Sequence, residues 1–103
     1  MNFGGSIVSK NIVERKGHLL WCIREEPANE LDNGWRFTSD IDDESFLSNP
    51  DNMVVCAWDT VVCLEPAVLG LVSFPVGTEL VLERENGKKF FVDPNTGEEV
   101  KLY

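Results

Sequence analysis

The sequence predicts an α+β domain, in which a mostly antiparallel sheet carries two or three short helices. Three observations support this fold class. Short apolar runs bounded by glycine, proline and asparagine are typical of strands. Asn86-Gly87 separates two of these runs and is a strong hairpin signal. Other segments begin with an acid or a proline and suffice for one or two helical turns. The 103 residues allow one core, so residues 1–103 are predicted to form a single domain.

The first two predicted strands lie on either side of a turn at residues 15–17 (RKG). Residues 6–8 form a short strand, and residues 11–14 remain ambiguous. Residues 18–24 (HLLWCIR) are apolar at both odd and even positions, which point to opposite faces of a strand. A strand that is apolar on both faces is typical of the centre of a sheet, so we expect this one to be covered on both sides.

The third predicted strand spans residues 35–38 and follows a loop over residues 25–33 that ends in a turn. Side chains alternate along a strand. Trp35 and Phe37 should therefore share one face, while Arg36 lies on the other.

A short helix and a strand are predicted next. The helix spans residues 42–47, with Asp40 as its N-cap. Asp43 and Glu44 then lie in the first turn, where carboxylates interact favourably with the helix dipole. Residues 53–58 (MVVCAW) predict another strand that is apolar on both faces.

The C-terminal part predicts two further helical segments and a hairpin. Residues 59–64 form a helix capped by Asp59, and residues 66–72 form a second that begins with proline. The hairpin covers about residues 79–92 and is followed by a short strand near Val100 and Leu102. Its expected cross-strand pairs are Leu82 with Phe91 and Val81 with Val92.

The charge of the chain narrows the class of partner. A net charge of −9, from 18 acidic and 9 basic residues, argues against nucleic acid, because affinity for phosphate backbones depends on clustered lysine and arginine. An acidic protein instead attracts basic partners. No apolar run reaches the ~18 residues of a membrane span, and the N-terminus lacks the pattern of a secretory signal. We therefore expect a cytoplasmic protein with no membrane partner.

The cysteines and the histidine predict neither a disulfide scaffold nor a metal site. Cys22, Cys56 and Cys63 are odd in number and lie in apolar runs, so we expect buried free thiols. His18 is the one histidine and there is no CxxC motif, so a zinc site is not expected. His18 and Cys22 would lie ~13 Å apart on a strand, too far for a catalytic dyad. The sequence also lacks a phosphate loop, and we expect no cofactor.

Residues 32–45 (DNGWRFTSDIDDES) combine two large aromatic residues and one arginine with five acids. Paired carboxylates hydrolyse glycosides in some enzymes, but a chain of this length has little material for the walls of a cleft. A calcium loop of the EF-hand type begun at Asp40 would contain no glycine. We therefore expect the acids to be solvated residues at a helix start.

Recognition is the function that this stretch favours. Tryptophan and arginine are enriched at the energetic centres of protein interfaces, and here they are adjacent. The predicted partner-binding residues are Trp35, Arg36, Asp40, Asp42, Asp43 and Glu44. The alternative is structural, with Trp35 and Phe37 packed inward and Arg36 bridging Asp32 or Asp40.

Three motifs carry a family resemblance: GGSIVSKNI over residues 4–12, REEP over residues 24–27 and DNGWRF over residues 32–37. Together they resemble a bacterial family of immunity proteins from polymorphic toxin systems, formerly a domain of unknown function. The resemblance spans residues 4 to about 75. Residues 38–42 (TSDID) depart from the family pattern, which has a glycine in this run and a different spacing of acids.

The resemblance implies a non-enzymatic protein that binds and neutralises a cognate protein toxin in the same cytoplasm. The acidic composition suits a basic toxin, such as a nuclease. Two alternatives remain open. The first is an accessory interaction domain with no toxin partner, which could form a homodimer. The second is a small hydrolase that uses paired acids.

Overall fold

Alternation along β3 (Asp32–Ser39) determines which side of the sheet becomes the core. The computed structural model describes residues 3–101. Trp35 and Phe37 are buried, whereas Arg36 between them is partly exposed on the opposite face. The rings of Trp35 and Phe37 stack with centroids 5.8 Å apart, and Trp58 lies 6.2 Å from Phe37. These three rings form the centre of the core, between the sheet and the helices.

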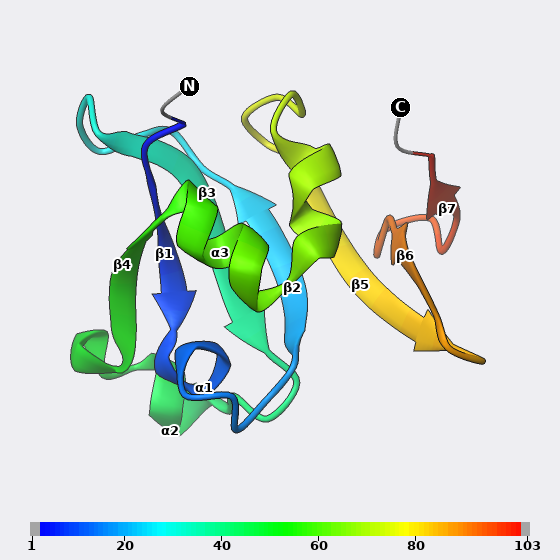
Figure 1. Cartoon of the computed structure of the whole chain (residues 1–103), viewed down its shortest axis with the longest axis horizontal. Coiled ribbons are helices and arrows are strands. Elements are labelled where there is room, and N and C mark those ends of the chain that lie inside the picture. The colour runs from blue at the N-terminus through cyan, green and yellow to red at the C-terminus, as the bar shows by residue number, and fades with distance from the viewer. Residues whose placement is uncertain (1–2, 102–103) are drawn as a thin grey trace.

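Over the described residues the sheet has seven strands, in the order β4-β1-β3-β2-β5-β6-β7 (Figure 1). The other strands are β1 (Gly5–Ser9), β2 (Leu19–Arg24), β4 (Met53–Ala57), β5 (Glu79–Glu85), β6 (Lys88–Val92) and β7 (Glu99–Val100). Neighbouring strands are antiparallel except for β1 and β3, which are parallel. The predicted α+β class with a mostly antiparallel sheet is confirmed.

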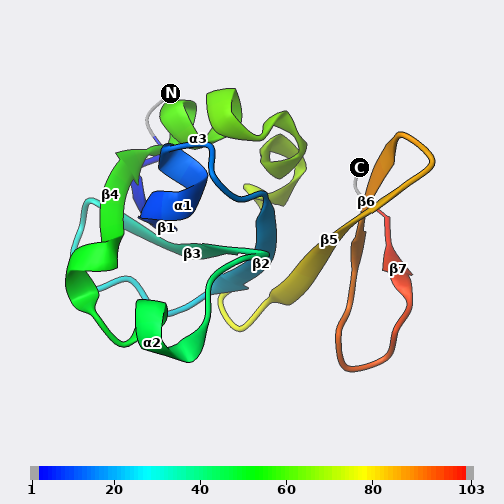
Figure 2. The ribbon, with the colours of Figure 1, turned by 90° about the horizontal axis from the view of Figure 1, so that it is seen from below.

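The helices are short. They are α1 (Lys10–Val13), α2 (Glu44–Leu47), α3 (Trp58–Leu64) and the 3₁₀ helices η1 (Pro50–Asn52) and η2 (Pro66–Leu71). Figure 2 shows α1, α3 and η2 on one side of the sheet and α2 on the other. Within residues 3–101, no helix is both long and apolar enough to cross a membrane.

β2 is central in the sheet, as predicted, but the expectation that both its sides are covered is wrong. Cys22 is fully buried on the side of α3, whereas Trp21 is 37% exposed on the other side. All helices with buried apolar residues lie on one face. An antiparallel sheet is stable with its second face in contact with water. We refer to this second face, which carries Ile7, Trp21, Ile23, Arg36 and Val55, as the open face.

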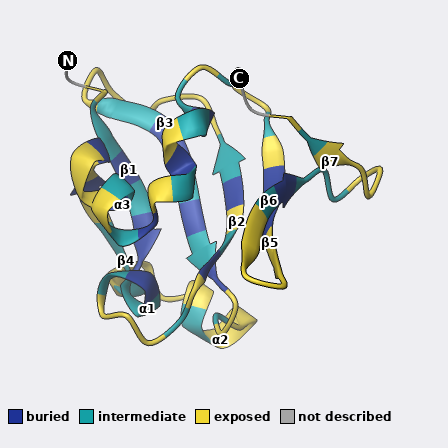
Figure 3. Cartoon of the chain, turned by 45° about the vertical axis from the view of Figure 1, so that its right-hand side comes forward, coloured by how far each residue is buried: buried dark blue, intermediate teal, exposed yellow. Residues whose placement is uncertain are grey.

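The C-terminal hairpin forms as predicted. Val81 pairs with Val92 and Leu82 with Phe91. The turn residues Asn86 and Gly87 have φ of 52° and 79°, as a two-residue hairpin turn with positive φ at both positions requires. The tip of this hairpin is exposed, while buried residues lie in the middle of β3 and β5 (Figure 3). Of the predicted last strand, Val100 belongs to β7 and Leu102 lies outside the described residues.

Two predicted helix starts are corrected. α2 begins at Glu44, and its N-cap is Asp43, which accepts a hydrogen bond from the Phe46 amide, rather than Asp40. Asp40 instead lies in the turn after β3. α3 begins at Trp58, so Asp59 lies inside its first turn and is not its cap. The segment that remained ambiguous, residues 11–14, belongs largely to α1.

The predicted loop and cysteine environments also change in part. The loop before β3 ends at residue 31, because Asp32 and Asn33 already pair as part of the strand. Cys22 and Cys56 are buried free thiols, as expected, whereas Cys63 is exposed. Cys63 belongs to α3, a helix that directs Trp58 and Val61 into the core and leaves its remaining face to solvent.

Gly34 allows the end of β2 to approach β3 closely. Its φ is 88°, and a Cβ at this position would lie 2.2 Å from the Glu25 carbonyl oxygen. We expect Gly34→Ala to lower the free energy of unfolding by about 3 kcal/mol, of which about 1–2 kcal/mol is the cost of positive φ. Gly87→Ala is the matched control, because Gly87 has φ of 79° and nothing within 4 Å of the added Cβ. Urea unfolding measures both variants, and equal losses would contradict the steric explanation.

Candidate partner-binding surface

Arg36 lies at the centre of the open face because of its position on β3. Strand register places it in one row with Val55 and Ile7 on one side and with Ile23 and Glu79 on the other. Residues paired across strands project to the same face. The predicted residue Arg36 therefore has exposed and half-buried apolar neighbours across several strands.

The Arg36 guanidinium is held by two carboxylates. Its Nη1 and Nη2 donate to Oδ1 and Oδ2 of Asp32 at 2.9 and 2.8 Å, and its Nε donates to Glu25 Oε2 at 3.0 Å. Such two-pronged pairing is the strong geometry for arginine and carboxylate. The hydrogen bond from Arg36 lowers the pKa of Asp32, and the same bond raises the pKa of Arg36. The structural alternative, with Arg36 bridging Asp32, is the arrangement that is present.

Trp35 lies on the opposite side of β3 and is 1% exposed. Besides stacking on Phe37, its ring contacts the Arg24 guanidinium, which lies 5.8 Å from the ring centroid. Because Arg24 pairs with Trp35 across β2 and β3, both side chains lie on the covered side of the sheet. Trp35, one of the predicted partner-binding residues, therefore lies in the core, whereas Arg36 and Glu25 remain at the surface of the open face.

Asp42, which lies just before α2, connects this segment to α1 and to the end of β3. Its carboxylate accepts hydrogen bonds from Asn11 Nδ2 at 2.8 Å, from the Ser39 hydroxyl at 2.6 Å and from the Ser39 amide at 2.7 Å. Burial by itself raises the pKa of Asp42, but the hydrogen bonds from Ser39 and Asn11 outweigh it and the pKa is lowered. The carboxylate thus joins α1 to the end of β3, which is a structural role.

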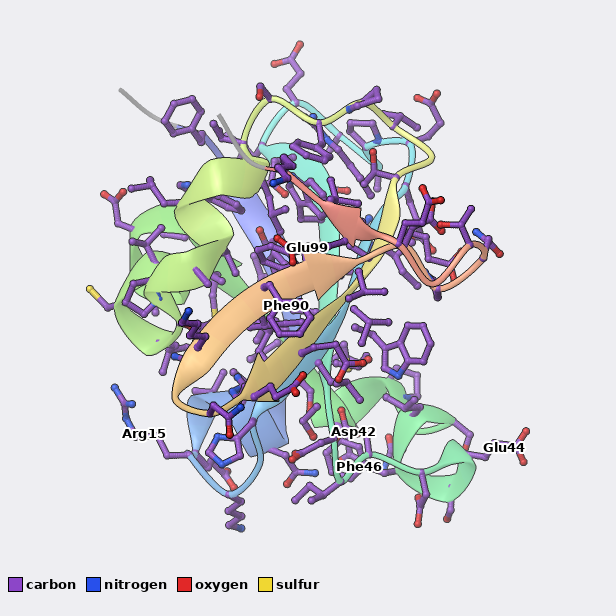
Figure 4. The ribbon with its side chains drawn as sticks, turned by 90° about the vertical axis from the view of Figure 1, so that its right-hand side faces the viewer. Arg15, Asp42, Glu44, Phe46, Phe90 and Glu99 are labelled. Atoms are coloured by element: carbon purple, nitrogen blue, oxygen red, sulfur yellow. The ribbon has the colours of Figure 1, made fainter. Side chains whose placement is uncertain are left out.

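The other three predicted acids lie at the surface beside the open face. Asp40 accepts a hydrogen bond from the His18 amide at 2.8 Å, and Asp43 caps α2. Glu44 points away from the body of the protein, on the side where Asp42 and Phe46 lie (Figure 4). Of these four acids, Asp42 is therefore the partly buried one, and Asp40, Asp43 and Glu44 are exposed. Among residues 3–101, no group of three metal-ligating side chains is arranged to hold an ion.

An apolar hollow on the open face was not predicted from the sequence. Its volume is about 270 Å³, and it lies between the start of β1, β4 and the loop before β3. The residues around it are Gly5, Ile7, Ala28, Asn29, Leu31, Asp32 and Val55. Leu31 and Val55 are 74% and 78% exposed. One feature of the sequence could have indicated this hollow. The strand MVVCA is apolar on both faces, so a sheet covered on one face leaves an apolar side chain of this strand exposed.

A second ionic cluster, also missed, lies on the side of the helices. Glu65 is 5% exposed and accepts hydrogen bonds from Arg84 at 3.0 Å and from Lys89 at 2.9 Å. Burial by itself raises the pKa of Glu65, but the bonds from Lys89, the Ala67 amide and Arg84 outweigh it and the pKa is lowered. The cluster attaches the C-terminal hairpin to the start of η2.

Together these features define a small α+β domain with one face covered by helices and a second face that carries an apolar hollow and is bordered by exposed acids. The family model described as Immunity protein Imm33 domain matches residues 6–92. The chain therefore belongs to this immunity-protein family, as its motifs indicated, and the match extends beyond residue 75 to the end of β6. Comparisons with curated proteins and with solved structures found no match.

Replacing Asp42 with asparagine is expected to lower the free energy of unfolding by about 1–3 kcal/mol, because buried donors lose a charged acceptor. The native pKa of Asp42 lies below the ordinary value of 3.8. Its contribution is therefore complete above that value and is lost as the pH falls through the lower native pKa.

Urea unfolding of the parent and of Asp42→Asn should accordingly differ most near neutral pH, and the difference should shrink in acid. Glu44→Gln serves as the control, since this side chain points to solvent, and should lower the free energy of unfolding by clearly less than Asp42→Asn does near neutral pH. A difference for Asp42→Asn that stays constant down to strongly acidic pH would contradict the assigned role of the carboxylate.

Proposed function

We propose that this protein neutralises a cognate protein toxin in the cytoplasm by binding it directly, with no catalysis of its own. The observation that carries the proposal is the family match over residues 6–92, since an immunity-protein family implies a toxin-neutralising role. The fold adds a physical reason. A sheet with one open face offers a broad surface that a partner protein covers.

The side chains of the predicted site support binding over catalysis. Asp40, Asp42 and Asp43 each accept hydrogen bonds that stabilise the local fold. Arg36 is paired with Asp32 and Glu25. Groups engaged in this way hold the surface in one shape, which lowers the entropic cost of association.

The charge of the surface supports a basic toxin as the partner. The chain carries a net charge of −9, and exposed acids border the open face in the loop before β3 and at α2. Opposite charges accelerate association and orient the encounter. We place the electrostatic contacts at Asp40, Asp43 and Glu44, with Arg36 contributing through its fixed ion pairs.

Co-expression tests the function. The polypeptide encoded by the adjacent toxin gene should arrest growth when expressed alone, and this protein should restore growth and co-purify with the polypeptide. A toxin that neither binds this protein nor is neutralised by it would leave the alternative, an accessory domain with no toxin partner. Light scattering on the purified protein measures whether it is a monomer or forms the homodimer considered under this alternative.

The electrostatic part of the proposal predicts a strong dependence on salt. The association rate of the complex, measured by stopped flow, should fall about tenfold or more between low and moderate ionic strength, because screening shortens the range of the charges. The dissociation rate should change much less. An association rate independent of salt would contradict a basic partner.

The contribution of α2 is tested by removing two charges while keeping the fold. Asp43→Asn with Glu44→Gln should slow association several-fold, and asparagine still caps the helix. Glu14→Gln with Asp59→Asn removes the same charge at the C-cap of α1 and in α3, on the covered side of the sheet. This control should have a clearly smaller effect. Equal effects would place the electrostatic contact elsewhere on the surface.

A further inference from the structure

The edge strand β4 is unusual in how little protects it. Among residues 3–101, no strand pairs with its outer side. Its sequence, MVVCA, contains neither a charged residue nor a proline, although edges of soluble sheets are commonly guarded by one or the other. The opposite edge of the sheet is β7, which is two residues long and therefore offers another strand few backbone groups for pairing. An unguarded apolar edge is a template for another strand.

Hydrogen bonding shows that Val55, in the middle of β4, directs its backbone groups toward this edge. The Trp58 amide donates to the Gly4 carbonyl at 3.0 Å, just beyond the paired residues of β4 and β1. Hydrogen-bonded pairs alternate with non-bonded pairs in an antiparallel ladder. Cys56 with Ser6 is therefore a bonded pair, and Val55 with Ile7 is not. The N–H and C=O groups of Val55 consequently point away from β1, toward the outer edge.

Val55 also belongs to the apolar hollow. Its side chain is 78% exposed and lines the hollow together with Leu31, which is 74% exposed. The hollow has a volume of about 270 Å³, enough for a large apolar side chain. Val55 thus presents outward-facing backbone groups and an apolar contact at the same place. A peptide that adds as a strand to a sheet edge uses both, because backbone hydrogen bonds provide affinity and a pocket for a side chain provides specificity.

The charges around the hollow determine the chemistry of the occupant. The adjoining loop contains exposed Glu25, Glu26 and Glu30 and no basic residue. A second copy of this chain would bring an equally acidic loop to the same edge, so repulsion disfavours self-pairing. A segment that carries lysine or arginine beside an apolar residue is attracted.

We propose that an extended segment of the toxin pairs with the outer edge of β4, places an apolar side chain in the hollow and directs lysine or arginine toward Glu25, Glu26 and Glu30. This inference rests on the proposed function and adds the surface and the chemistry of the partner. The exposed acids near α2 then contact a more distant part of the same toxin.

The test uses the full chain and the purified polypeptide encoded by the adjacent toxin gene. Val55→Lys introduces a charge into the hollow and should weaken the Kd at least tenfold. Leu69→Lys is the matched control, because Leu69 is 58% exposed in η2, on the covered side of the sheet, and the change in net charge is identical. This variant should bind within about twofold of the parent. Thermal unfolding confirms that both variants fold.

Hydrogen exchange supplies a readout of the backbone contact. The Val55 amide should exchange at least tenfold more slowly in the complex than in the free protein. Parent-like binding by both variants, or unchanged exchange at Val55, would contradict the proposal that β4 is the contact surface. The proposal that this protein binds the toxin would still stand. Loss of self-association in Val55→Lys with unchanged toxin affinity would assign the edge to a homodimer and overturn the proposal. Absence of binding by the parent would remove the proposed function itself.

Discussion

The burial of Trp35 and Phe37 on one side of β3 is the constraint from which the rest of the structure follows. Removing a buried aromatic side chain typically costs about 3–5 kcal/mol, and burying the Arg36 guanidinium in the apolar core without a partner would cost further free energy. The aromatic residues therefore decide which way the strand faces, and Arg36 is left on the opposite side. Trp58 of α3 then covers the aromatic pair. All further burial by helices occurs on that side, and the second face stays open.

The sequence was informative wherever the determining contacts are local. Asn86-Gly87 fixed the hairpin and its register, because the turn geometry depends on those two residues alone. The alternation of Trp35, Arg36 and Phe37 was likewise correct. The two-sided coverage expected for β2 was wrong, since it depends on where helices from later in the chain pack. The N-cap of α2 was misplaced because the Asp40 carboxylate is engaged by the His18 amide, a contact 22 residues away in sequence.

The candidate surface was foreseeable in part. Motifs around residues 32–37 indicated the family, and Arg36 was expected to pair with Asp32 as one alternative. The role of Asp42 was missed because its partner Asn11 lies 31 residues earlier. The hollow was missed for the same reason: Leu31 and Val55 come from segments that meet only after the sheet has formed. Within one short acidic run, Asp42 is partly buried in contacts with Asn11 and Ser39, whereas the acids that we propose for recognition are exposed, and composition does not separate the two kinds.

The position of β1 between β3 and β4 has a consequence for biosynthesis. Both neighbours of β1, which are β3 and β4, are encoded after it, and β4 ends at Ala57. The residues up to Ala57 must therefore emerge from the ribosome before β1 is paired on both sides. Contacts between residues distant in sequence slow folding. Pairing of β1 with β4 is therefore a late step in closing this part of the sheet.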